Sequence, residues 1–267
     1  MIWLSKTFSD SLGRPWTKLD DAFAVEGEEY RNPEGANRRT LRFEVDGKGY
    51  FLKLHWGVGW NEILKNLLSL RLPVFGAANE WRDIQRLGEL GVETMRLVAY
   101  GQEGWNPATQ RSFVVARELE NSISLEDYCA DWAGRSPAFA EKQRLIARVA
   151  AMTRRLHQNG INHRDLYICH FLLRQTWDGA EETLHLHLID LHRVQLRRRV
   201  PRRWRVKDVG SLYFSAMETG LTRRDLWHFL RVYHDQPLRS IFEQQGEFLR
   251  AVEKRAMALK EKGIPDE

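Results

Sequence analysis

The stretch INHRDLYICHFLL, residues 161–173, indicates the fold most directly. It contains His163-Arg164-Asp165, a tripeptide that occurs in the catalytic loops of phosphoryl-transfer enzymes. His170 departs from such loops, which carry a metal-binding asparagine at this place. A three-letter match is weak alone because chance supplies many of them, so the order of the neighbouring elements has to decide.

The predicted elements on both sides of this stretch are those of a kinase-like catalytic core. A helix over Glu141–His157 has its apolar residues on one face and ends at Asn159-Gly160. Two short strands follow, Phe171–Arg174 and Leu184–Leu191, and the second contains Asp190. A catalytic-loop aspartate followed by a second aspartate after a strand is the order of parts in such a core.

A β-hairpin is predicted upstream. Leu41, Phe43 and Val45 alternate with charged residues, as in a half-buried strand, and Asp46-Gly47 offers a tight turn. The segment KGYFLKLHW, residues 48–56, returns as the partner strand and carries Lys53. Two later segments, 92–101 and 111–120, are also predicted to be strands, so an antiparallel sheet is expected in the first part of the chain.

Helices are predicted between and after these strands. One covers residues 61–72, and another covers residues 80–91 with Asn79 as its N-cap. Glu80 therefore follows Lys53 on a helix, which supplies a lysine and a glutamate in the order of a kinase-like nucleotide site. Nearer the other end, Thr222 and Asp225 predict a capping box that begins a further helix.

Four residues, Lys53, Glu80, Asp165 and Asp190, suit the chemistry of phosphoryl transfer, which consists mainly of positioning groups and neutralising phosphate charge. Lys53 would contact the α- and β-phosphates, and Glu80 would hold it in place. Asp190 would bind magnesium, because a hard dication prefers carboxylate oxygen. Asp165 would accept the proton of an attacking hydroxyl. Taken singly, each also has an ordinary interpretation: an exposed lysine, an acid favoured by the helix dipole, a turn cap, and an acid paired with Arg193.

Asp208 has two interpretations. It opens the segment DVGSLYFSAM, so it could cap a helix. Kinases also use an aspartate at this place to hold the backbone of the catalytic loop, and the sequence leaves both interpretations open.

A zinc site is an alternative use of the histidines. His163, Cys169, His170 and the pair His185 and His187 include nitrogen and sulfur ligands, and two residues one apart on a strand face the same way. Their spacings match no familiar zinc pattern, and half-buried strand histidines are common, so the kinase interpretation is preferred.

The composition restricts the class of protein. Of the 267 residues 43% are hydrophobic, which is enough for a sizeable core. The only cysteines are Cys129 and Cys169, which suits a reducing compartment. No apolar run is long enough to span a bilayer, and the first residues lack the apolar core of a secretory signal. We therefore expect a cytoplasmic protein, at most peripheral to a membrane.

The net charge of +5 comes from one segment. RVQLRRRVPRRWRVK, residues 193–207, contains seven arginines, one lysine and no acid, so the rest of the chain is net negative. Apolar residues interrupt the run, which favours an anion-binding site over a solvated tail. Trp204 is its only aromatic residue, which argues against nucleic acid. A degenerate kinase-like module that binds an anion through this segment is the non-enzyme alternative.

Five segments resemble the family of lipopolysaccharide core heptose(I) kinases (WaaP/RfaP), in the protein-kinase-like superfamily. They are RRTLRFEVDGKGYFLK, EILKNLLSLRLPVFGA, ISLEDYCADW, GINHRDLYICHFLL and VPRRWRVKD. The resemblance runs over nearly the whole chain. It implies an α+β, bilobal fold, with a small antiparallel-sheet N-lobe over residues 1–117 and a larger helical C-lobe over residues 118–267.

The same resemblance implies a function. The expected reaction transfers phosphate from ATP, with Mg²⁺, to the first heptose of the lipopolysaccharide inner core. It also implies acyl carrier protein as a partner, which the residues themselves do not suggest. Other acceptors for the same chemistry are a different sugar, an aminoglycoside or a protein tyrosine. An acceptor with acidic sugars and lipid phosphates would lie at an anionic membrane surface, which suits the basic segment.

These considerations give the expected site. Asp165 and Arg164 are the catalytic residues, Lys53, Glu80, Glu118 and Leu119 bind the nucleotide, and Asp190 and His170 bind the metal. Arg197, Arg198, Arg202, Arg203 and Arg205 bind the acceptor, since arginine makes paired contacts with phosphate.

Three features depart from protein kinases in general. The loop NPEGANRR lacks the glycine triplet that covers the phosphates, so Asn37, Arg38 or Arg39 would replace it. Leu191-His192 follows Asp190 in place of phenylalanine-glycine, which argues against a flipping activation switch. His170 replaces asparagine, as it does in the heptose kinases, and its imidazole could bind the metal or donate to phosphate oxygens.

Overall fold

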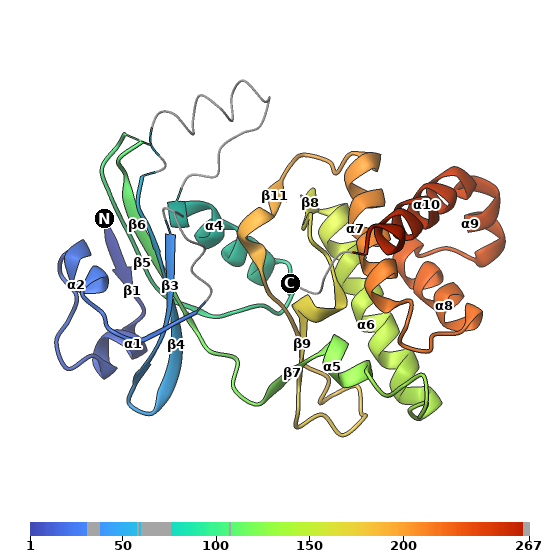
Figure 1. The fold of residues 1–267 in the computed structure, drawn as a ribbon, viewed down its shortest axis with the longest axis horizontal. Coiled ribbons are helices and arrows are strands. Elements are labelled where there is room, and N and C mark those ends of the chain that lie inside the picture. Colours follow the sequence, from blue (N-terminus) through green and yellow to red (C-terminus); the bar gives the residue numbers. More distant parts are fainter. Residues whose placement is uncertain (31–37, 58, 60–75, 107, 264–267) are drawn as a thin grey trace. The chain divides into compact units, whose positions relative to one another are not determined.

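The structure is a computed structural model of the chain, and it describes residues 1–30, 38–57, 59, 76–106 and 108–263 (Figure 1). The chain forms two compact units. The first comprises Met1–Arg86 and Met95–Glu120, and the second comprises Leu87–Thr94 and Asn121–Glu267. The helix expected over residues 61–72 lies outside the described residues. The lobe boundary expected after residue 117 remains a prediction.

Within the described residues, the first unit contains a six-stranded sheet with the strand order β1-β5-β6-β4-β3-β2. All neighbouring strands pair antiparallel, as the sequence predicted. The strands are β1 (Ile2–Leu4), β2 (Glu28–Glu29), β3 (Arg38–Val45), β4 (Lys48–His55), β5 (Leu97–Glu103) and β6 (Arg111–Arg117). The predicted hairpin is confirmed as β3 and β4, and its turn residues Asp46 and Gly47 both take positive φ.

The larger apolar cluster of the first unit lies on one face of this sheet, and a smaller cluster around Ala77, Tyr100 and Val114 lies apart from it. Leu41 of β3 and Leu52 of β4 are directly opposite each other and fully buried. Phe8 of α1 (Lys6–Ser11) and Leu19 of α2 (Leu19–Phe23) belong to the same apolar cluster. Because successive side chains of a strand alternate between faces, Lys53 points to the face opposite Leu52.

Helix α4 (Gly76–Glu89) begins earlier than the sequence pattern predicted. Asn79 lies inside the first turn, so the prediction that it is the N-cap is wrong. The Ala77 N–H donates instead to Ser112 Oγ of β6 at 3.0 Å, and this hydroxyl is fully buried. A helix end satisfied from a distant strand leaves no local signal in the sequence. The predicted stop is confirmed, because Gly91 follows the helix with a φ of 63°.

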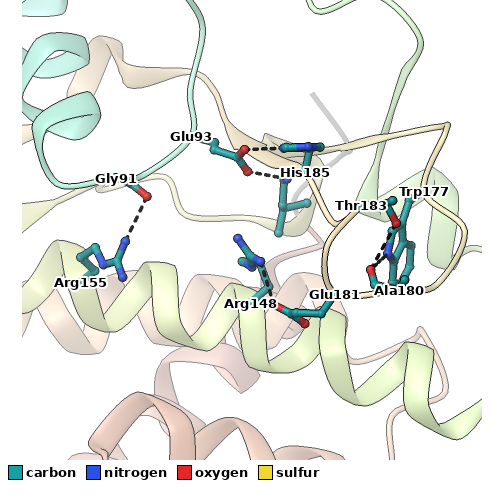
Figure 2. A network of polar contacts seen from close by, with 10 residues as sticks. Gly91, Glu93, Arg148, Arg155, Trp177, Ala180, Glu181, Thr183 and His185 are labelled. Atoms are coloured by element: carbon teal, nitrogen blue, oxygen red, sulfur yellow. Dashed lines mark hydrogen bonds and ion pairs between the residues drawn. The ribbon is translucent and has the colours of Figure 1, made fainter.

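Residues 87–94 are fixed to the second unit by polar contacts (Figure 2). The Glu93 carboxylate lies 2.7 Å from His185 Nδ1 and accepts the Leu186 N–H at 3.0 Å. Arg155 donates to the Leu90 and Gly91 carbonyl oxygens at 3.1 and 3.0 Å. These bonds pair carbonyl groups that the end of α4 would otherwise leave unsatisfied, so they stabilise the segment where it lies.

The second unit is mainly helical. Its helices are α5 (Leu125–Cys129), α6 (Phe139–Gln158), α7 (Arg202–Ala216), α8 (Arg223–His234), α9 (Leu238–Gln244) and α10 (Gly246–Lys262). Its short strands and 3₁₀ turns are β7 (Ser122–Ser124), β8 (Ile161–Asn162), η1 (Ile168–His170), β9 (Phe171–Arg174), β10 (Leu186–Leu188), η2 (Leu191–Arg193) and β11 (Gln195–Leu196). The predicted helix over 141–157 is confirmed as α6, and the predicted capping box of Thr222 and Asp225 begins α8.

The strand pair after the catalytic-loop stretch is also confirmed, as β9 and β10. Strand β10 ends earlier than predicted, because Asp190 takes the left-handed conformation, with a φ of 59°, and begins η2. This backbone turn sets the direction of the Asp190 side chain. Across the described ranges, no helix is long and apolar enough to cross a membrane.

Candidate active site

Lys53 and Glu80 form an ion pair in the first unit. Lys53 Nζ of β4 lies 2.6 Å from Glu80 Oε1 of α4, so the expected contact is present. The Glu80 side chain is 6% exposed and that of Lys53 is 25% exposed. Breaking a pair this buried leaves an uncompensated charge, which costs about 3–5 kcal/mol. The ammonium group is therefore held in one place on its face of the sheet.

Glu118 and Leu119 follow β6. The Glu118 carboxylate accepts from Arg42 Nε at 3.1 Å and lies 2.9 Å from Arg42 Nη2. The Glu118 N–H donates to the Gly49 carbonyl oxygen at 2.9 Å. The Glu118 side chain is thus engaged with β3, and the nucleotide-binding role assigned to both residues remains a prediction.

The residues proposed to replace the glycine triplet are placed only in part. Arg39 Nη2 lies 2.6 Å from Glu29 Oε1, so this guanidinium pairs across the sheet edge. Arg38 lies opposite His55 in the hairpin. Asn37 lies outside the described residues.

The backbone of the loop after β8 is held by Asp208. Its two carboxylate oxygens accept the His163 and Arg164 N–H groups, each at 2.8 Å. Asp208 is fully buried in the interior of α7, so the helix-cap interpretation is wrong and the loop-holding interpretation is confirmed. Arg164 takes a φ of 78°, which is uncommon for a residue with a side chain. The two bonds from Asp208 help to keep it there.

His163 connects this loop to the segment that carries Asp190. The imidazole is fully buried, and burial lowers its pKa, so the ring is neutral at pH 7. Its Nε2 lies 3.0 Å from the Ile189 carbonyl oxygen. A carbonyl can only accept, so Nε2 carries the proton and donates it. The residue before Asp190 is thereby tied to the catalytic loop.

His170 and Asp190 face each other. His170 Nδ1 lies 2.8 Å from the Asp165 carbonyl oxygen, so Nδ1 carries a proton and donates it. The other ring nitrogen, Nε2, lies 3.5 Å from Asp190 Oδ2. The other oxygen, Oδ1, contacts His192 Nδ1. A deprotonated Nε2 and a carboxylate oxygen at this separation would be two acceptors that a cation can bridge.

The Asp165 carboxylate contacts two cationic side chains that sequence reasoning did not assign to it. Arg193 Nη1 lies 2.9 Å from Oδ2, and Lys207 Nζ of α7 lies 3.3 Å from Oδ1. Burial lowers the pKa of Lys207, and Asp165 opposes this effect. The sequence also allows Arg193 to pair with Asp190; in the structure Arg193 contacts Asp165. The only sequence signal for Lys207 is its position directly before Asp208.

The ring of Trp204 lies against three arginine side chains, two of which belong to the basic segment. The guanidinium groups of Arg164, Arg197 and Arg203 lie 5.2, 5.9 and 5.4 Å from the centre of its ring. Such cation–π contacts hold arginine side chains while leaving their N–H groups able to donate. The expected acceptor residues Arg197, Arg198, Arg202 and Arg203 are exposed.

Arg205 differs from those four arginines. It is half-buried, and its guanidinium lies 5.6 Å from the centre of the Phe248 ring of α10. It lines a cavity with residues of α6 and α8.

The zinc alternative finds no support in the geometry. Among the described residues, no three His, Cys, Asp or Glu side chains converge on one point. His185 is instead bound to Glu93. Magnesium makes smaller demands, since it keeps several waters and takes one or two protein carboxylates. The Asp190 carboxylate meets this requirement, although the His170 imidazole is a softer ligand than magnesium usually takes.

These features define the class of the protein: it is a kinase with a protein-kinase-like fold. A model of the lipopolysaccharide kinase (Kdo/WaaP) family matches residues 20–233, and the chain belongs to this family. Membership makes it a sugar kinase that uses ATP.

Characterised relatives agree with this assignment. The chain is 51% identical, over 99% of its length and 98% of the relative, to the lipopolysaccharide core heptose(I) kinase WaaP of Escherichia coli. It is 49% identical to the protein of the same name from Pseudomonas aeruginosa, over 93% of both chains. A solved structure described as WaaP in complex with acyl carrier protein superposes with a TM-score of 0.81 at 42% identity, covering 97% of this chain and 99% of that one.

Proposed function

We propose that this chain transfers the γ-phosphoryl group of ATP to heptose I of the lipopolysaccharide core. One observation carries the proposal: Asp165 lies in a loop held by Asp208, in a chain about half identical to heptose(I) kinases along nearly its whole length. The reaction takes place in the cytoplasm, with the acceptor presented at the inner face of the membrane.

Lys53 binds the α- and β-phosphates of ATP in this proposal. The ion pair with Glu80 supports the role, because it fixes the ammonium group without covering it fully. Glu118 and Leu119 contact the nucleotide through their main chain, since the Glu118 side chain is engaged with Arg42.

His170 and Asp190 would hold Mg²⁺. The fit rests on the lone pair of His170 Nε2 and on Asp190 Oδ2, which face each other at 3.5 Å. The ion would supply positive charge to the transferred phosphoryl group. The tautomer of His170 is fixed by the Asp165 carbonyl oxygen, which favours binding of metal over donation to phosphate.

Asp165 orients the acceptor hydroxyl and accepts its proton. Each carboxylate oxygen has two lone pairs, so the contacts with Arg193 and Lys207 leave one on each oxygen. These two cations fix the carboxylate and place positive charge beside the transferred phosphoryl group. Arg164 acts as a positioning residue, through its backbone bond to Asp208 and its contact with Trp204.

The acceptor binds to Arg197, Arg198, Arg202 and Arg203. The acceptor carries acidic groups, and exposed arginines can contact phosphate or carboxylate in pairs.

Acyl carrier protein is the proposed partner. The related WaaP structure contains this protein, which supports an equivalent complex here. The second unit also has a cavity of about 290 Å³ lined mainly by apolar residues, including Leu145, Leu212, Leu226 and Phe229. An acyl chain needs such surroundings. Titration should show tighter binding of acylated than of unacylated carrier protein.

The function is tested by supplying ATP, Mg²⁺ and core lipopolysaccharide that lacks heptose phosphate, with transfer followed by mass spectrometry. Phosphate should appear on heptose I with the wild-type chain. Asp165→Asn should abolish transfer while thermal unfolding stays cooperative. Asp131→Asn makes the same change at an exposed position and should remain active. Phosphate on a different sugar would overturn the acceptor assignment, and an active Asp165→Asn enzyme would overturn the catalytic one.

A further inference from the structure

A second cavity, of about 250 Å³, lies in the second unit and is lined by basic side chains. Arg154 comes from α6, Arg199 from the segment before α7, and Arg205 from α7. Tyr233 and His234 of α8 also line the cavity. Three chain segments thus place guanidinium groups around one space.

The charge around this cavity is strongly positive. Burial, with a further contribution from Arg205, lowers the pKa of His234 to about 4, so His234 is neutral at pH 7 and the positive charge belongs to the arginines. Among the acids of the described residues, Asp235 offsets part of it, with Oδ2 lying 2.8 Å from Arg154 Nη1. Asp235 is 76% exposed, and an ion pair of this kind is weak.

Two polar atoms of the lining residues lack a hydrogen-bond partner within the described structure. They are Arg205 Nε and His234 Nε2, and both are buried. Leaving a buried donor or acceptor unpaired costs about 1–3 kcal/mol, so such atoms call for a ligand or water. Tyr233 is not in this position, because its hydroxyl lies 2.8 Å from His157 Nδ1.

We propose that this cavity is a binding site for a phosphate group, separate from the sites for ATP and for the acceptor hydroxyl. Arg199 and Arg205 would donate to the phosphate oxygens, with Arg154 adding charge. Arginine suits this ligand because its N–H groups match pairs of phosphate oxygens. The cavity volume exceeds that of a lone phosphate, so a small phosphomonoester also fits.

The proposed phosphate site lies next to residues that support the loop containing Asp165. His157, which also lines the cavity, is bound on its other nitrogen, Nε2, to Asp208 Oδ2 at 3.2 Å. Asp208 in turn holds the backbone of the catalytic loop. A phosphate in the cavity therefore lies next to the residue that supports the loop anchor.

The test is calorimetric titration of the full chain with inorganic phosphate at constant ionic strength, with chloride as the replaced anion. We expect saturable binding. Arg199→Gln and Arg205→Gln should each weaken it at least about tenfold, as expected for loss of a charge-assisted hydrogen bond. Arg199 is exposed, so Arg199→Gln leaves the fold intact even if Arg205→Gln, which removes the contact with Phe248, does not.

Arg224→Gln is the matched control. Arg224 is an exposed arginine of α8 that does not line the cavity, so this variant should bind phosphate as the wild type does. A second titration with glucose 1-phosphate identifies the source: tighter binding than that of inorganic phosphate indicates a sugar phosphate, and equal binding indicates the free anion. The proposal is overturned if phosphate does not bind saturably, or if Arg199→Gln binds it unchanged. It is also overturned if Arg224→Gln weakens binding as much as Arg199→Gln. The titration requires no ATP turnover, so its result is independent of the proposed kinase activity.

Discussion

Replacing Asp208 by asparagine should damage the catalytic loop without removing its chemistry. Asp208 accepts two buried N–H groups at 2.8 Å and contacts His157 Nε2 at 3.2 Å. Asparagine has one acceptor oxygen, and its amide group would face a second N–H group. At least one backbone N–H, that of His163 or Arg164, then loses its partner.

The expected cost follows from these contacts. One buried N–H left unpaired costs about 1–3 kcal/mol, and replacing a charged acceptor by a neutral one weakens the remaining bonds. We therefore expect Asp208→Asn to lower the free energy of unfolding by about 2–4 kcal/mol. The value of kcat should fall at least about tenfold, because Arg164 and Asp165 lose their fixed backbone. The KM for ATP should change little, since Lys53 and Glu80 keep their contact.

The assay combines urea unfolding with initial rates of phosphate transfer. Ser211→Ala is the control on the same helix: Ser211 is fully buried and its Oγ has no hydrogen-bond partner within the described structure, so its removal should be neutral or stabilising. An Asp208→Asn protein with wild-type kcat, and with a free energy of unfolding within about 0.5 kcal/mol of wild type, would refute the reasoning.

Three further outcomes are expected. Glu80→Gln should raise the KM for ATP at least about tenfold, because Lys53 loses the partner that holds it in place. The free energy of unfolding without nucleotide should also fall, by up to about 3–5 kcal/mol, since a buried charge is left unpaired; an unchanged KM would contradict this. Lys207→Met should lower kcat at least about tenfold, with an unaltered circular dichroism spectrum, because Asp165 loses one of its two cations; full activity would argue against a role for this lysine. Burial raises the pKa of Asp83 to about 7, so this group stabilises the fold below the unfolded value of 3.8 and loses that contribution as the pH rises through 7. Asp83→Asn should therefore be more stable than wild type at pH 8, by up to about 4 kcal/mol, and should show no such gain at pH 4. Urea unfolding at both pH values measures this. A variant that is more stable than wild type at pH 4 but not at pH 8 would exclude a buried protonated carboxyl.

Features that depend on neighbouring residues were predictable from the sequence. The turn at Asp46-Gly47 and the capping box of Thr222 and Asp225 are local, and each is present as predicted. Features that depend on distant contacts were not. Strand β1 is defined only by its pairing with β5, in which Ile2 lies opposite Gly101. Helix α4 begins early because Ser112, on another strand, satisfies its first turn.

The candidate site likewise has features that the sequence predicts and features that it does not. The order of Lys53, Glu80, Asp165 and Asp190 could be read from the chain, because kinase-like parts occur in a fixed sequence. The environment of Asp165 could not. A run of like charges predicts an exposed surface that binds an anion. No local pattern shows that Arg193 and Lys207 contact Asp165 while the other cations of the run do not.

The tripeptide at residues 163–165 shows why a three-letter match becomes a functional loop only with its surroundings. His163 is bound to the carbonyl before Asp190, Arg164 to Asp208 and Trp204, and Asp165 to Arg193 and Lys207. All these partners come from the segment that follows β10. The basic run of residues 193–207 therefore has two proposed roles, one at Asp165 and one at the acceptor. Its ends, Arg193 and Lys207, contact the carboxylate of Asp165, the proposed base, so removing charge from the ends should lower kcat. Removing charge from the exposed middle should raise the requirement for the acceptor.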